Sequence, residues 1–116
     1  MKNVLVVEDE DSLRLLYKQE LTKEGFNIIT VDSGEDAINK VDTSEIDLVV
    51  LDIRLSGMNG LEALEGMLTK RRNLKVIINT AYTTYKDDFS SWLADAYLIK
   101  SSDLSELKTT IHKLMN

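Results

Sequence analysis

The chain contains no cysteine and no proline, and its only histidine is His112. The lack of cysteine excludes disulfides, thiolate metal sites and cysteine nucleophiles, and it fits a reducing compartment. A single histidine disfavours a histidine-cluster metal site and a Ser-His-Asp triad. We expect His112 to lie solvated beside the apolar stripe of the last helix.

Long apolar runs are also missing. No stretch approaches the ~18 residues needed to cross a bilayer, and the run after Met1 is too short for a signal-peptide core. The formal net charge of −6 disfavours direct binding to nucleic acid. We therefore expect a cytoplasmic protein with one domain over residues 1–116, which is a usual length for a single domain.

The chain does contain a regular alternation of short apolar runs and amphipathic segments. The apolar runs predict buried β-strands at residues 3–8, 26–31, 47–52, 74–79 and 96–99. Helical spacing predicts helices that begin near Asp11, Ser33, Asn59, Thr84 and Asp103. Five βα units imply an α/β fold: one doubly wound, flavodoxin-like parallel sheet of five strands in the order 2-1-3-4-5, with five helices on both faces.

Three of the predicted helices carry capping signals. Ser33 with Asp36 and Asp103 with Glu106 have the spacing of a capping pair, and Asn59 is a favoured N-cap residue. We expect each to satisfy backbone N–H groups in the first turn of its helix.

Helical spacing also assigns buried and exposed sides. In the first helix it predicts an apolar stripe of Leu13, Leu16, Tyr17 and Leu21. Leu15 falls opposite this stripe, where it is either an ordinary exposed leucine or a partner contact. The helix predicted around residues 84–94 is less regular, and we expect its Trp92 to pack rather than to bind a ligand.

Carboxylates follow two of the predicted strands. Glu8 and Asp9 come at the end of the first strand, and Asp52 at the end of the third. In the order 2-1-3-4-5 the winding reverses between these strands, and ligands bind outside the carboxyl ends at that point. Clustered carboxylates repel one another, and a divalent cation relieves the repulsion. All-oxygen ligands of this kind suit Mg²⁺, so the sequence predicts a magnesium site.

The same edge of the sheet has the components of a phosphoryl acceptor. Beside a cation Asp52 can stay ionised, and carboxylate attack on phosphorus gives an aspartyl phosphate. Thr80 and Lys100 end the fourth and fifth strands, so they border the same edge. Lys100 can neutralise phosphoryl oxygens, and the Thr80 hydroxyl can donate to one.

Four segments in this order, VLVVEDE, LVVLDIRLSGMNG, NTAY and AYLIK, resemble the receiver domain of bacterial response regulators over essentially the whole chain. The resemblance implies a signalling domain rather than an enzyme. Its phosphoryl group comes from a phosphohistidine on a sensor histidine kinase or a histidine phosphotransfer protein. Its output goes to an unknown protein target, without direct nucleic-acid or membrane binding by this domain.

Carried over by position, the resemblance assigns the metal side of the site. Asp52 is the phosphoacceptor, and Glu8 and Asp9 are the acidic pair, with Asp9 the direct Mg²⁺ ligand. Arg54 contributes its backbone carbonyl to the metal.

The resemblance also assigns the phosphate side. Thr80 and Lys100 contact the phosphoryl group, and Tyr97 is the switch aromatic. Arg54 and Tyr82 occupy the positions that flank the path of the hydrolytic water. Neither is a carboxylate or an amide and both are large, so we expect a long-lived phosphoryl group.

The chain departs from the family pattern at three places. Ser56 and Ser101 replace prolines, and the interval from Thr80 to Lys100 is about two residues short, which predicts a shortened or loosened fourth helix. Relatives with Lys-Pro hold that bond cis. Because cis costs ~2.5–4 kcal/mol before serine and only ~0.5–1 kcal/mol before proline, we predict a trans Lys100–Ser101 bond with the amine still directed at Asp52.

Three alternatives compete with this interpretation. A Mg²⁺-dependent phosphohydrolase with an aspartate nucleophile needs a nearby second acid, but position 54 is Arg and the next acid is Glu62. A degenerate receiver that acts only as a binding module would not need the intact set of site residues. A flavin binder would need a fuller phosphate loop than residues 56–60 offer.

Overall fold

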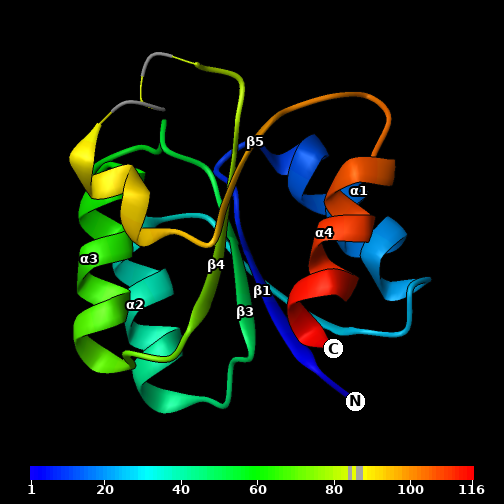
Figure 1. Ribbon diagram of the computed structural model, residues 1–116, viewed down its shortest axis with the longest axis horizontal. Helices are drawn as coiled ribbons and strands as arrows, with labels where there is room; N and C mark the ends of the chain where they lie inside the picture. Colours follow the sequence, from blue (N-terminus) through cyan, green and yellow to red (C-terminus); the bar gives the residue numbers. More distant parts are fainter. Residues whose placement is uncertain (84, 86–87) are drawn as a thin grey trace.

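The computed structural model describes residues 1–83, 85 and 88–116. Its core is a parallel sheet of five strands in the order β2-β1-β3-β4-β5, which confirms the predicted topology (Figure 1). The strands are β1 Asn3–Val7, β2 Asn27–Val31, β3 Leu48–Leu51, β4 Lys75–Thr80 and β5 Ala96–Ile99. The central strands β1, β3 and β4 are almost wholly buried, as the continuous apolar runs predicted.

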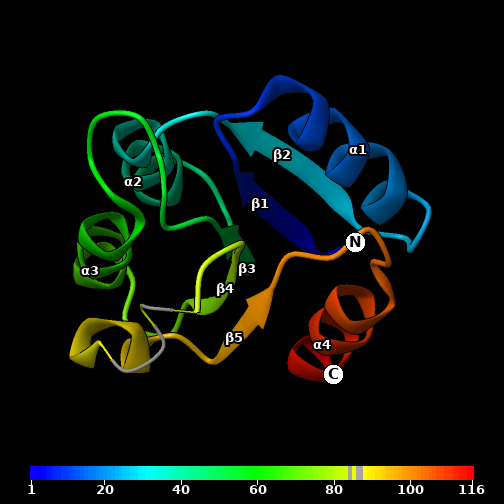
Figure 2. The ribbon, with the colours of Figure 1, turned by 90° about the horizontal axis from the view of Figure 1, so that it is seen from above.

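Helices cover both faces of the sheet (Figure 2). The described residues form four α-helices, α1 Asp11–Thr22, α2 Gly34–Thr43, α3 Gly60–Lys70 and α4 Ser105–Met115, and one 3₁₀ helix, η1 Phe89–Leu93. The helices α2 and α3 lie with η1 on one face, and α1 and α4 lie on the other. Each face has its own apolar cluster, because alternate residues of a strand point to opposite sides.

The five helices expected on the two faces correspond, among the described residues, to the four α-helices and the 3₁₀ helix η1. A helix over residues 84–94 was predicted, but the described part of that segment forms only the short η1; Thr84, Lys86 and Asp87 lie outside the described residues. Trp92 is 66% exposed, which also contradicts its predicted packing.

Two of the three capping predictions are confirmed. The Ser33 hydroxyl accepts the Asp36 N–H at 3.2 Å, and the Asn59 side chain accepts the Glu62 N–H at 3.0 Å. Asp103 accepts the N–H of Ser105 at 2.9 Å, but α4 has no side-chain cap bond at its N-cap, so the predicted pair with Glu106 does not form.

The predicted stripe of α1 is correct in part. Tyr17 and Leu21 are buried and Leu13 is half-buried, but Leu16 is 39% exposed. Leu15 is exposed, as its position opposite the stripe predicted. No helix among the described residues is long and apolar enough to cross a membrane.

Candidate functional site: a carboxylate cluster at the carboxyl edge of the sheet

Residues that follow parallel strands meet at one edge of the sheet. Beyond the regular strands the backbone ladder continues: the Asp52 N–H donates to the Val7 carbonyl at 3.2 Å, and the Lys100 N–H donates to the Thr80 carbonyl at 2.8 Å. These bonds fix where the side chains of Asp52 and Lys100 leave the sheet.

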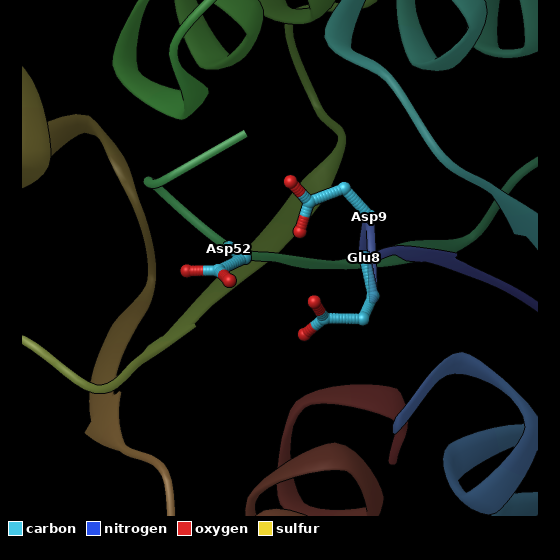
Figure 3. Close-up of side chains that lie close together, drawn as sticks. All are labelled: Glu8, Asp9 and Asp52. Atoms are coloured by element: carbon cyan, nitrogen blue, oxygen red, sulfur yellow. The ribbon is translucent and has the colours of Figure 1, made fainter. Parts of the chain in front are cut away.

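Glu8, Asp9 and Asp52 form a compact carboxylate cluster. One oxygen from each lies within 4.8 Å of the others, as three ligands of one cation require. Glu8 and Asp52 are 2% and 6% exposed, and Asp9 is half-buried. Figure 3 shows Asp9 and Glu8 extending in opposite directions from β1, with Glu8 on the side of α1 and α4. This cluster of oxygen ligands fits a hard divalent cation such as Mg²⁺.

Lys100 balances part of this charge. Its ammonium donates to Glu8 Oε1 at 2.6 Å and to Asp52 Oδ2 at 2.8 Å. Burial lowers the pKa of Lys100, but the hydrogen bonds with Asp52 and Glu8 outweigh burial, and the pKa lies well above its usual value. Burial raises the pKa of Glu8, and the bond from Lys100 only partly opposes this. Lys100 therefore stays charged at neutral pH.

The predicted backbone around Lys100 is confirmed. The Lys100–Ser101 peptide bond is trans, as are the other peptide bonds of the described residues. The amine still reaches Asp52, as predicted.

Thr80 lies at the end of β4 with its side chain fully buried. Its hydroxyl has no hydrogen-bond partner among the described residues. A buried hydroxyl without a partner is costly, and such groups often have a functional explanation. The hydroxyl is therefore available to a group that enters the site.

Arg54 extends over the mouth of the site. Its guanidinium carbon lies 4.5 Å from the centre of the Tyr82 ring, and Nη1 donates to the Tyr85 hydroxyl at 3.3 Å. Its backbone N–H donates to Asp52 Oδ1 at 3.4 Å. A cavity of about 250 Å³ opens here, lined by Asp9, Ile53, Arg54, Leu55, Ser56, Asn59 and Tyr85.

Tyr97 connects β5 to the segment after β4. Its ring is half-buried, and its hydroxyl donates to the Tyr82 carbonyl at 2.6 Å. Burial raises the pKa of Tyr97. One hydrogen bond thus joins Tyr97, the expected switch aromatic, to Tyr82, which is expected to influence the lifetime of the phosphoryl group.

Sequence reasoning missed two contacts at the site. Ser56 was identified only as a replaced proline, but its hydroxyl donates to Asp9 Oδ2 at 3.3 Å. Tyr85 was not singled out, because its contact with Arg54 depends on how two loops meet.

His112 lies away from this site. It was expected to be solvated, but it is half-buried, with its ring 4.9 Å from that of Phe26 and Nε2 3.0 Å from Glu24 Oε1.

The sequence matches the response regulator receiver domain family over residues 4–112, so the chain belongs to that family. Members of this family are signalling modules rather than classical enzymes. The response regulator ArlR of Staphylococcus aureus is 32% identical over 117 aligned residues, which cover 99% of this chain and 53% of that protein. The chain thus spans about half the length of the curated relatives it matches.

Solved structures agree with this assignment. Response regulator TrrA of Thermotoga maritima, crystallised with Mg²⁺ and BeF, is 45% identical with a TM-score of 0.95, over 98% of this chain and 99% of that one. A second structure, of histidine kinase ThkA in complex with TrrA, contains a chain that matches this one at 44% identity and a TM-score of 0.93, over 100% of each of the two matched chains.

Proposed function

We propose that this domain accepts a phosphoryl group on Asp52 and switches the surface it offers to a downstream protein. The observation that carries the proposal is the position of Asp52, a buried carboxylate beside Glu8, Asp9 and the Lys100 ammonium. The likeness to TrrA, crystallised with Mg²⁺ and BeF, supports the same chemistry here.

The transfer step follows from the groups present. An Asp52 carboxylate oxygen forms a bond to phosphorus while the bond from phosphorus to the histidine nitrogen of the donor breaks, and that nitrogen regains a proton. Lys100 neutralises charge on the phosphoryl oxygens, and the Thr80 hydroxyl donates to one of them.

Mg²⁺ is the cofactor that the cluster fits. Glu8, Asp9 and Asp52 supply carboxylates, and the Arg54 carbonyl completes the protein ligands. Bound Mg²⁺ supplies positive charge that offsets both the carboxylates and the phosphoryl group. Asp9 is the direct acidic ligand, held in part by Ser56.

The switch involves Thr80 and Tyr97. When the buried Thr80 hydroxyl turns to the phosphoryl group, the segment from Thr80 to Tyr82 moves with it, and the Tyr97 hydroxyl is bonded to that segment. Only contacts made in the phosphorylated state drive this change.

The donor is a sensor histidine kinase or a histidine phosphotransfer protein. The complex of ThkA with TrrA supports a kinase partner. Leu15 on α1 is 57% exposed and lines a shallow hollow with Lys18, Gln19, Thr22 and Lys23, which offers the donor a contact surface. We infer that residues 1–116 act as one receiver domain in the cytoplasm, on a protein target and without direct contact of this domain with nucleic acid or membrane; the family match over residues 4–112 supports the single domain.

Acetyl phosphate with Mg²⁺ tests the proposal. We expect intact-mass spectra to show one added phosphoryl group on the wild type and none on Asp52→Asn. The matched control is Asp47→Asn, which removes a carboxylate distant from the cluster and should be labelled like the wild type. Equal labelling of the wild type and Asp52→Asn would contradict the assignment of Asp52.

The phosphoryl group is long-lived because Arg54 and Tyr82 shield it. The contact of the Arg54 guanidinium with the Tyr82 ring supports a shared cover over the side from which water would approach, and neither side chain is suited to orient a water. We expect Arg54→Ala with Tyr82→Ala to speed loss of phosphate several-fold, measured by mass after the donor is removed. An unchanged or slower rate would contradict shielding.

A further inference from the structure

A buried hydrogen bond joins α1 to β4 beside the site. The Asn79 side-chain amide donates to the Tyr17 hydroxyl at 3.2 Å, across 62 positions of sequence. Asn79 is 5% exposed and Tyr17 is 3% exposed. Asn79 is a buried polar residue that follows the apolar residues 76–78 of β4, so its amide depends on a partner from another element.

This bond lies on the same face of the sheet as the Lys100 side chain. Alternation along β5 places Lys100 on the same side as Ala96 and Leu98, which pack with the cluster that contains Tyr17. Because β4 lies between β5 and β3, the Lys100 side chain must cross the end of β4 to reach Asp52. Asn79 occupies the end of β4 on this face, where it meets Tyr17.

The electrostatics agree with this placement. Burial raises the pKa of Tyr17, the nearby Lys100 ammonium opposes this, and the charges of Glu8 and Asp52 add smaller upward contributions. The Tyr17 phenol is therefore close enough to sense the ammonium and its carboxylate partners. Lys100 itself is only 17% exposed, so its surroundings are protein rather than bulk water.

We propose that Tyr17 and Asn79 are positioning residues for Lys100, and that their hydrogen bond forms a polar floor that holds the ammonium between Glu8 and Asp52. The proposal deepens the proposed function and rests on it for the role of Lys100. Without the Tyr17 hydroxyl, the buried Asn79 amide loses its acceptor and must turn to another. We expect the freed amide to compete with the Lys100 ammonium for the carboxylate oxygens of Glu8 and Asp52, which displaces the ammonium.

The nuclear magnetic resonance signal of the Lys100 ammonium tests this positioning directly in the unphosphorylated protein. We expect ¹H–¹⁵N spectra to show a protected Lys100 ammonium signal, assigned by its loss in Lys100→Met. Tyr17→Phe removes only the hydroxyl, and we expect it to shift this signal and to speed its hydrogen exchange at least threefold. Asn79→Ala leaves no amide to compete for the carboxylates, so we expect it to change the signal less than Tyr17→Phe does, and we expect the double variant to resemble Asn79→Ala.

Ile111→Val is the matched control, because Ile111 is fully buried in the same apolar cluster but carries no polar group. It should lower stability and leave the Lys100 signal unchanged. An unaltered signal in Tyr17→Phe, an equal change in Ile111→Val, or no protected Lys100 signal in the wild type would each overturn the positioning role.

Phosphorylation kinetics separate this proposal from the proposed function. With acetyl phosphate and Mg²⁺, we expect Tyr17→Phe to lower the rate constant at saturating donor roughly tenfold, because small misplacements cost catalysis heavily, and Ile111→Val to match the wild type. An unchanged rate constant in Tyr17→Phe would overturn the positioning role. A wild type that takes up no phosphate would contradict the proposed function, while the ammonium spectra would still decide the placement of Lys100.

Discussion

At the residue scale, Thr80 has a buried hydroxyl without a partner. We expect Thr80→Val to raise the free energy of unfolding by about 1 kcal/mol, because an apolar group of the same shape removes an unmet polar group. Urea unfolding of the unphosphorylated protein measures this. Thr80→Ser keeps the hydroxyl, loses a methyl group, and should be less stable than the wild type. A less stable Thr80→Val would indicate that the hydroxyl is already satisfied.

Glu8 gives the site a pH dependence of definite sign. Burial raises its pKa above the usual 4.5, so the native state binds its proton more tightly than the unfolded chain does. The stabilisation that this tighter proton binding gives the native state is complete below pH 4.5, and it is lost as pH rises through the pKa of Glu8 in the native state.

Glu8→Gln removes this titration. Without metal, we expect the variant to be more stable than the wild type at pH 7, because burial penalises the Glu8 charge and Lys100 keeps Asp52 as a partner. The gain should shrink towards pH 4. Urea unfolding from pH 4 to pH 8 measures both trends, and a gain that grows towards low pH would contradict the raised pKa.

At the element scale, the start of α3 is packed against the backbone that leads to Arg54. A Cβ at Gly60 would lie 2.2 Å from the Asp52 carbonyl oxygen and 2.6 Å from the Ile53 Cα. Gly66, in the middle of α3, would meet only the flexible tip of Ile38, at 2.5 Å. The two glycines of one helix therefore have different roles.

Gly60→Ala and Gly66→Ala form a matched pair. We expect Gly60→Ala to lose at least about 2 kcal/mol of unfolding free energy, because backbone atoms must move. In Gly66→Ala the better helix propensity, about 1 kcal/mol, offsets the contact with Ile38. Urea unfolding measures both. Equal losses in the two variants would show that the approach of α3 to Asp52 is not the limiting contact.

At the scale of the whole molecule, the carboxylate cluster links stability to the cofactor. A ligand that binds only the folded state, at a free concentration a hundred times its Kd, raises the free energy of unfolding by about 2.7 kcal/mol. For a domain of this size that is roughly 10 °C in Tm. We expect thermal unfolding to show such a rise with Mg²⁺ and its reversal by a chelator.

Asp9→Asn is the informative variant for this effect. It should lose most of the rise with Mg²⁺ and gain stability without the metal, because one of three repelling carboxylates is gone. The same Mg²⁺-dependent rise in Asp9→Asn and in the wild type would place the cation elsewhere.

The sequence by itself determined the sheet, its order and which residues gather at its carboxyl edge. Apolar runs are buried wherever they fold, and the carboxyl ends of parallel strands share one edge. Glu8, Asp52, Thr80 and Lys100 therefore meet there whatever the details of the loops. The caps of α2 and α3 were also predictable, because Ser33 and Asn59 act within three residues.

Only the tertiary structure decided the contacts between segments distant in sequence. Helical spacing near η1 was weak, and the described part of that segment forms only the 3₁₀ helix η1, with Trp92 66% exposed. The bond from Asn79 to Tyr17 depends on how α1 lies across the sheet. The contact of Arg54 with Tyr85 depends on two loops. Local pattern carries no information on such pairs, because their geometry is set by packing.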